Sequence, residues 1–128
     1  MSSDRNYRLG DLQLEIMKVL WKSAAASVAG VRRQLAGERL AYTTVATMLR
    51  KMEDRGLVRH RAEGRRFIYE PAVTAEEVSR SAADDLVDRL FEGSLADTVT
   101  HLLQTREVSP RELAELERLI KKRKKNSS

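Results

Sequence analysis

The sequence contains no cysteine, few aromatic residues and no long apolar run. The absence of cysteine from all 128 residues excludes disulfides, thiolate metal sites and thiol chemistry. No apolar segment approaches the roughly 20 residues that span a bilayer, and the N-terminal MSSDRNYRLGD lacks the apolar region of a signal peptide. We therefore expect a cytoplasmic protein without membrane insertion. Aromatic residues make up only 5%, so its core must consist mainly of Leu, Val, Ile, Met and Ala.

The residues that usually build catalytic sites are also scarce. The two histidines, His60 and His101, are widely separated in the chain, and there is no glycine-rich phosphate loop. The sequence offers neither a nucleophile with its base nor a set of metal ligands. We therefore expect no enzyme activity, no metal and no cofactor.

The net charge of +5 is unevenly distributed. Residues 1–73 contain 14 Lys and Arg against 8 Asp and Glu, whereas residues 74–120 contain 5 against 11. The segment KKRKK at 121–125 follows, and we expect it to be a solvated terminus. A basic first half joined to an acidic second half indicates that only the first half meets a polyanion.

Apolar spacing predicts three helices in the first half of the chain, over residues 9–21, 28–36 and 42–55. Ser27 can cap the second of them. Gly56 follows the third, where a residue in the left-handed conformation ends many helices. These signals predict three short helices, each with one apolar face that can pack in a common core.

The period changes after the third helix. LVRHR and RFIYE are short, rich in β-branched and aromatic residues, and separated by AEGR, in which Gly64 can take positive φ at a turn. They predict a β-hairpin that ends at Pro71, and we expect Phe67, Ile68 and Tyr69 to lie in the core behind it. Three helices followed by a basic hairpin is the order of a winged helix-turn-helix.

The second half contains three further predicted helices, with capping signals at Thr74, Ser94 and Ser109. Three short amphipathic helices bury little core alone, so we expect their stripes to form a shared core in a homodimer. The fold class is therefore mainly α with a small β-hairpin: a winged helix-turn-helix DNA-binding domain at 1–73 and a three-helix dimerisation domain with a basic tail at 74–128. The predicted dimerisation residues are Leu86, Leu90, Phe91, Leu95, Val99, Leu102, Leu103, Leu113, Leu116 and Ile120.

The third helix carries the candidate DNA-binding face. On a helical wheel, Thr43, Thr47 and Arg50 lie opposite the apolar stripe. Short hydroxyl side chains near a helix N-terminus suit phosphates and base edges, and an arginine can bond both O6 and N7 of guanine; the alternative is an ordinary solvated face. Arg32 and Arg33 of the second helix are weaker candidates for backbone contact. The predicted DNA-binding residues are Tyr42, Thr43, Thr44, Thr47, Arg50, Lys51, Arg59, Arg61, Arg65 and Arg66.

The segments LGDLQLEIMKVLW, AYTTVATMLRKMEDRGLV and RFIYEP resemble the penicillinase repressor family, BlaI/MecI, of dimeric winged-helix regulators. The similarity covers nearly the whole chain. It implies a repressor that binds a palindromic operator of β-lactam resistance or related stress genes as a homodimer. In such a repressor the third helix enters the major groove, here with Thr43, Thr44, Thr47 and Arg50.

The resemblance also implies a route of inactivation. In the best-known members a membrane-bound sensor protease responds to β-lactam, and the repressor is cut at an Asn-Phe bond in its penultimate helix. His101 and Leu102 stand at that place here, within TVTHLLQ, and form the candidate protease-sensitive bond although the residue types differ. A copper-responsive branch of the family uses a cysteine-rich C-terminal motif, which this chain does not have.

Two other functions stay open. A small-ligand-responsive repressor of the MarR type would need a sizeable apolar cavity between the two modules, where we expect Phe91, Leu95 and Leu102 to be used in packing. A winged helix used for protein assembly would instead dock an acidic partner on its basic face. The salt dependence of binding to duplex DNA would separate this last reading from a repressor.

Overall fold

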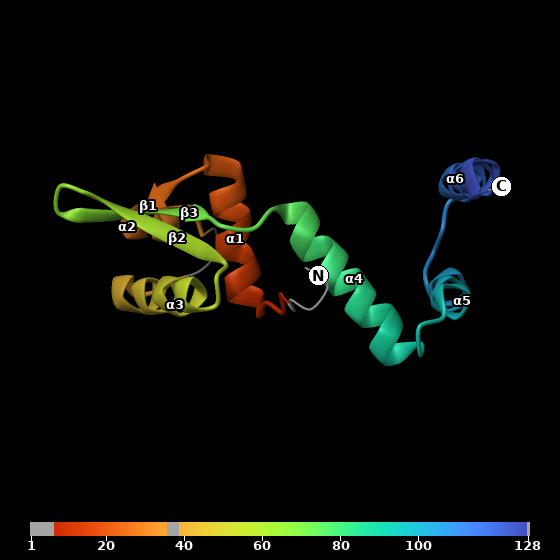
Figure 1. Cartoon of the computed structure of the whole chain (residues 1–128), viewed down its shortest axis with the longest axis horizontal. Helices are drawn as coiled ribbons and strands as arrows, with labels where there is room; N and C mark the ends of the chain where they lie inside the picture. The colour runs from red at the N-terminus through yellow and green to blue at the C-terminus, as the bar shows by residue number, and fades with distance from the viewer. Residues whose placement is uncertain (1–6, 36–38, 128) are drawn as a thin grey trace. The chain divides into compact units, whose positions relative to one another are not determined.

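The computed structural model describes residues 7–35 and 39–127. The chain divides into two compact units, residues 1–85 and 86–128. The described part confirms the predicted class, because three helices are followed by a β-hairpin and then by three more helices. The predicted second helix ends at Gln34, and Ala36 lies outside the described residues. The elements of the first unit are α1 (Asp11–Ser23), β1 (Ala26–Ser27), α2 (Val28–Gln34), α3 (Tyr42–Asp54), β2 (Val58–Glu63), β3 (Arg66–Pro71) and the first part of α4 (Ala75–Leu90) (Figure 1).

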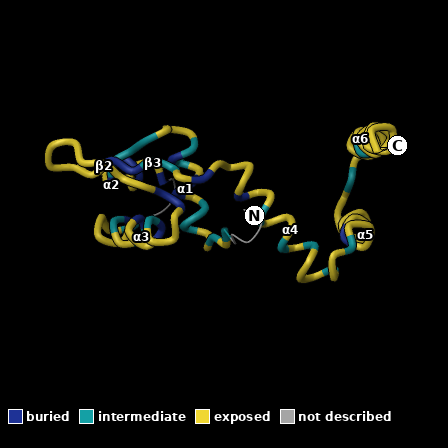
Figure 2. The backbone as a smooth tube through the Cα atoms, viewed as in Figure 1, coloured by how far each residue is buried: buried dark blue, intermediate teal, exposed yellow. Residues whose placement is uncertain are grey.

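One apolar core holds the first unit together (Figure 2). The stripes that the helical spacing predicts all point into it, and β2 and β3 close it on one side. Met17 and Met52 are fully buried, as their places on the stripes predict, whereas Met48 and Trp21 lie at the edge of the core. The side chains with no exposed surface are Ile16, Met17, Leu20, Val31, Val45, Leu49, Met52 and Leu57. This packing fixes which face of each helix is left for solvent.

The sheet has three antiparallel strands in the order β1-β3-β2, one more than the predicted hairpin. β1 consists of only Ala26 and Ser27, which pair with Tyr69 and Ile68 of β3. Two residues show no alternation of polarity, so the sequence could not reveal this strand. It anchors the base of the hairpin to the segment before α2.

Gly56 ends α3 with φ +77°, as predicted, and an added Cβ there would meet no atom within 4 Å. The cost of a side chain at this position is therefore backbone strain alone. Gly56→Ala is expected to lower the free energy of unfolding by about 1 kcal/mol. Gly56→Asn is the matched variant, because asparagine tolerates this conformation better and should cost less. Chemical denaturation measures both, and equal costs for the two variants would contradict the backbone explanation.

The boundary between the units lies within α4, between Asp85 and Leu86, rather than between residues 73 and 74 as expected. Val78 of α4 is only 7% exposed and belongs to the core of the first unit. Thr74 and Glu77 form the predicted capping box, in which each side chain accepts a backbone N–H of the other residue at 3.0 Å. The first turns of α4 thus complete the winged domain before the chain leaves it.

The second unit contains the end of α4, then α5 (Leu95–Thr105) and α6 (Pro110–Ser127). Ser94 caps α5 by accepting the backbone N–H of Asp97 at 3.0 Å, as predicted. The basic segment KKRKK is exposed, as expected of a solvated terminus, but it is helical and continues α6. No helix among the described residues is long and apolar enough to cross a membrane.

The described part of the second unit has one buried residue, Thr98, whose hydroxyl donates to the Ser94 carbonyl oxygen at 2.8 Å. Phe91 and Leu116 are half-buried. Leu119 of α6 is also exposed, although it is not among the predicted dimerisation residues. The exposed apolar side chains of this unit are Leu86, Leu90, Leu95, Val99, Leu102, Leu103, Leu113, Leu119 and Ile120.

Candidate nucleic-acid interface

The face of α3 opposite the core is open to solvent. Thr43, Thr47 and Arg50 are exposed, and Thr44 and Lys51 flank them at the surface. Packing of the apolar stripe against the core turns these side chains to solvent, because they lie on the opposite face of the helix. This arrangement presents two cations and three hydroxyls on one helix.

The start of α3 differs from the start of most helices in this chain. Ser27, Thr74, Ser94 and Ser109 each accept a backbone N–H in the first turn of α2, α4, α5 and α6. α3 has Ala41 as its N-cap, and a methyl group cannot accept a hydrogen bond. The backbone N–H groups of its first turn therefore have no side-chain acceptor, and such a turn favours an anion. Tyr42 lies at this end and is half exposed.

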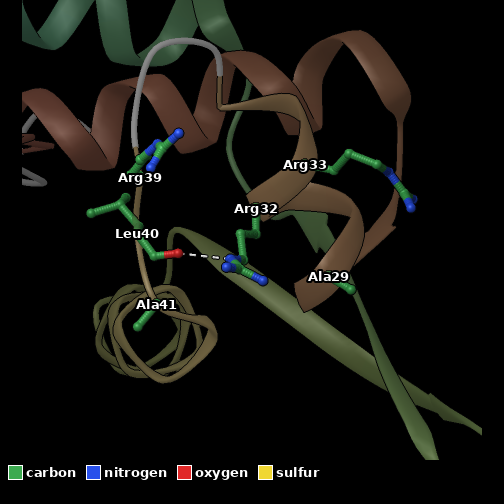
Figure 3. Close-up of a pocket in the computed structure, with 6 residues that line it drawn as sticks. All are labelled: Ala29, Arg32, Arg33, Arg39, Leu40 and Ala41. Atoms are coloured by element: carbon green, nitrogen blue, oxygen red, sulfur yellow. Dashed lines mark hydrogen bonds between the residues drawn. The ribbon is translucent and has the colours of Figure 1, made fainter.

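Three arginines gather before α3, in a shallow pocket lined by Ala29, Arg32, Arg33, Arg39, Leu40 and Ala41 (Figure 3). Arg32 of α2 donates from Nε to the Leu40 carbonyl oxygen at 2.7 Å, which ties α2 to the chain entering α3. Arg33 points away from Leu40 in Figure 3. The lining residues include no acidic side chain, so the pocket suits a phosphate. Sequence reasoning named Arg32 and Arg33 but missed Arg39, which lies in no predicted element.

The hairpin has two sides of different chemistry. Cross-strand partners in an antiparallel pair point to the same side. One side carries His60 opposite Tyr69 and Ala62 opposite Phe67, and we call it the α3-facing side because His60 contacts Glu53 of α3. Arg59, Arg61 and Arg66 share the other side. The predicted arginine cluster is therefore turned away from α3, except for Arg65, which lies in the turn.

Two of these arginines are already paired. Arg59 donates from Nε to Glu70 at 2.7 Å, and Arg61 contacts the second oxygen of Glu70 at 3.2 Å and Glu63 at 3.0 Å. The hydrogen bond from Arg59 holds the pKa of the Glu70 carboxyl below its usual value. Two glutamates thus offset part of the charge that the sequence places on the hairpin. Arg65 and Arg66 are exposed at its end.

The prediction that Phe67 lies in the core is wrong, because 50% of its surface is exposed. Ile68 and Tyr69 are buried as expected. They lie at the base of the hairpin, where packed elements cover both of its sides, whereas Phe67 lies near the turn. Alternation along a strand says which side a residue faces, but not how far along the strand that side stays covered.

Glu53 and His60 form a contact between α3 and the hairpin that sequence reasoning missed. The imidazole Nδ1–H donates to both carboxylate oxygens of Glu53, at 2.7 and 2.8 Å. The same ring lies 4.3 Å from the ring of Phe67 and 5.4 Å from that of Tyr69, between centroids. Because β2 follows α3 directly, only the folded turn at Gly56 brings the two side chains together.

The sequence of this chain is similar to those of known proteins. A family profile described as Penicillinase repressor matches residues 9–122. The penicillinase repressor of Bacillus licheniformis is 27% identical over 118 residues, which cover 91% of this chain and 92% of the relative. The transcriptional regulator BlaI of Mycobacterium tuberculosis is 32% identical over 100 residues, covering 76% of this chain and 72% of the relative.

A solved structure shares the fold of the winged unit. The solution structure of the DNA-binding domain of the repressor BlaI superposes with a TM-score of 0.51 and 30% sequence identity. The match covers 56% of this chain and 89% of that domain.

Proposed function

This chain belongs to the penicillinase repressor family, and from that premise we propose that it represses transcription by binding operator DNA as a homodimer. The observation that carries the proposal is the exposed face of α3, where Thr43, Thr47 and Arg50 share one side of the helix. A helix of this size fits the major groove of duplex DNA. A protein that binds operator DNA must be in the same compartment as that DNA, so we place this protein in the bacterial cytoplasm.

In the proposed complex, α3 enters the groove with its first turn leading. The backbone N–H groups after Ala41 meet a phosphate, and Thr43 and Thr44 lie close enough to that end to approach the same strand. Arg50 lies two turns further along and reaches a base edge, with guanine as the preferred partner. Lys51 and Tyr42 contact the backbone on either side.

The remaining cations contact phosphates rather than bases. Arg65 and Arg66 are at the exposed end of the hairpin, and Arg32 and Arg39 line the pocket before α3. Contacts of this kind fix the position of the protein on the duplex without reading sequence. Arg59 and Arg61 join them only to the extent that Glu70 releases them.

Glu70→Gln tests this last point. The carboxylate binds both arginines, so its removal should raise affinity for any duplex about three- to tenfold at low salt and make the log–log salt slope steeper by about 1 to 2. Because the pKa of Glu70 is lowered, the charge that is removed is fully present at neutral pH. Glu63→Gln is the matched control, since Arg61 keeps its contact with Glu70 there, and it should have a smaller effect. An unchanged slope in Glu70→Gln would show that these arginines stay clear of DNA.

The proposed dimer rests on the second unit. Its described residues bury one side chain, Thr98, while nine leucine, isoleucine and valine side chains stay exposed. An apolar surface of that kind is stable in water only when another surface covers it. A second copy offers the same surface, as a twofold dimer requires.

Dimerisation sets the form of the operator. Two recognition helices related by a twofold axis read two half-sites about 34 to 36 Å apart, which makes the operator palindromic. Binding of one half-site makes the second contact effectively intramolecular. Separation of the second units would therefore release the DNA.

Proteolysis is the mode of release that we propose, and a membrane-bound sensor protease would be the partner. His101 and Leu102 lie in the middle of α5, and the Leu102 carbonyl oxygen accepts the backbone N–H of Arg106 at 3.2 Å. Proteases act on extended backbone, so α5 must unwind before this bond is cut. Limited proteolysis of the chain with and without operator, followed by mass spectrometry of the fragments, locates the cut.

Selection of bound fragments from genomic DNA tests the function as a whole. Enrichment of a palindrome, followed by a steep linear fall of log affinity with log salt on that duplex, is expected. Binding to no duplex, or binding that ignores salt, would point instead to protein assembly through the basic face.

A further inference from the structure

Phe67 is an exposed aromatic side chain in an unusual setting. Its ring is half exposed near the end of the hairpin, and it lies on the α3-facing side together with His60 and Ala62. Figure 1 shows the turn of the hairpin projecting beyond α3. Single exposed apolar residues are common on proteins, so exposure alone assigns no role.

The ring of Phe67 is held in place. It packs at 4.3 Å against the imidazole of His60, which in turn bonds both oxygens of Glu53 on α3. A side chain bonded across two elements in this way loses the freedom to rotate, and so does the ring packed on it.

The α3-facing side of the hairpin is also the side near Arg50. His60 of that side contacts Glu53, and Glu53 lies one helical turn from Arg50 on α3. Tyr69 and Phe67 lie on the same side of β3, two residues apart. DNA that Arg50 contacts would therefore run next to the side that presents Phe67.

We propose that Phe67 is a direct DNA contact, which packs its ring against the apolar deoxyribose surface of the strand beside the groove that α3 enters, and that Glu53 and His60 are positioning residues for it. The inference rests on the proposed function and adds to it an uncharged contact. Deoxyribose is the part of the backbone with apolar C–H groups, and its contact needs no counterion release. The hairpin thus acts by packing as well as by charge.

The experiment uses the full chain and a duplex that carries its selected operator, titrated over a series of salt concentrations. Phe67→Ser should lower affinity about fivefold at every salt concentration and leave the slope unchanged, because no phosphate contact is lost. Phe67→Leu should retain most of the affinity. Thermal unfolding of each variant checks that the fold is intact, which a half-exposed position allows.

Coupling between residues tests the positioning role. In a His60→Ala background, Phe67→Ser should cost much less than fivefold, because the ring is no longer held, and Glu53→Ala should act in the same way. Full affinity of Phe67→Ser, or additive losses in the double variants, would overturn the inference. Failure of the parent chain to bind the duplex in a salt-dependent way would instead overturn the proposed function, so the two are told apart by the parent alone.

Discussion

Leu116→Asp is expected to convert the protein to a monomer and to lower its affinity for a two-half-site operator by about 10²- to 10⁴-fold. Leu116 is half-buried in the middle of α6, with Leu113 and Ile120 exposed on the same side of the helix. A carboxylate there would have to lose its hydration inside an apolar interface. The free energy of that desolvation exceeds the stabilisation that burial of the neighbouring leucine side chains gives to the dimer. The two binding sites then act independently.

Sedimentation velocity and operator titration measure the two parts of this prediction. Ala114→Asp is the matched control, because it adds the same charge to the exposed opposite side of α6 and should leave the dimer intact. A duplex with a single half-site should bind the parent and Leu116→Asp almost equally. A Leu116→Asp protein that sediments as a dimer would remove the basis of the proposed interface.

Arg50→Ala is expected to weaken binding to the selected operator by about 1 to 3 kcal/mol, which is roughly five- to 150-fold. Its guanidinium is exposed on the face of α3 that carries Thr43 and Thr47. An arginine that bonds a guanine carries sequence information, so the loss should be far smaller on a scrambled duplex. The preference for operator over scrambled DNA is therefore the sensitive quantity.

Competition between operator and scrambled duplex measures that preference directly. Arg106→Ala, which removes the same charge from the exposed end of α5, controls for the change in net charge. If Arg50 only holds a phosphate, affinity for both duplexes should fall by the same factor, and the assignment to a base would be wrong.

Local signals predicted α3 and the elements around it well. The stripe of α3, the positive φ of Gly56 and Gly64, and the caps at Ser27, Thr74 and Ser94 all follow from a few neighbouring residues. Periodicity and turn chemistry act over one or two turns of chain, so a sequence displays them directly.

Features that depend on pairing could not be predicted in the same way. β1 is defined by its partners in β3, about 40 residues further along, and shows no pattern of its own. The register of the hairpin decides which side chains share a side. It places Arg59 and Arg61 beside Glu70, with which they form ion pairs, and leaves Phe67 exposed. The two compact units divide within α4 because Val78 of α4 packs in the core of the first unit.

The sequence by itself determined the order of the elements, the inward faces of the helices and the side of α3 that stays free, because the spacing of apolar residues contains this information. Tertiary structure alone decided which arginines are available, that His60 joins Glu53, and that the ring of Phe67 is exposed beside α3. The physical reason is that charge pairing and burial depend on distances across the folded chain. The exposed face of α3 can thus be located from the sequence, while the contacts around it become visible only after folding.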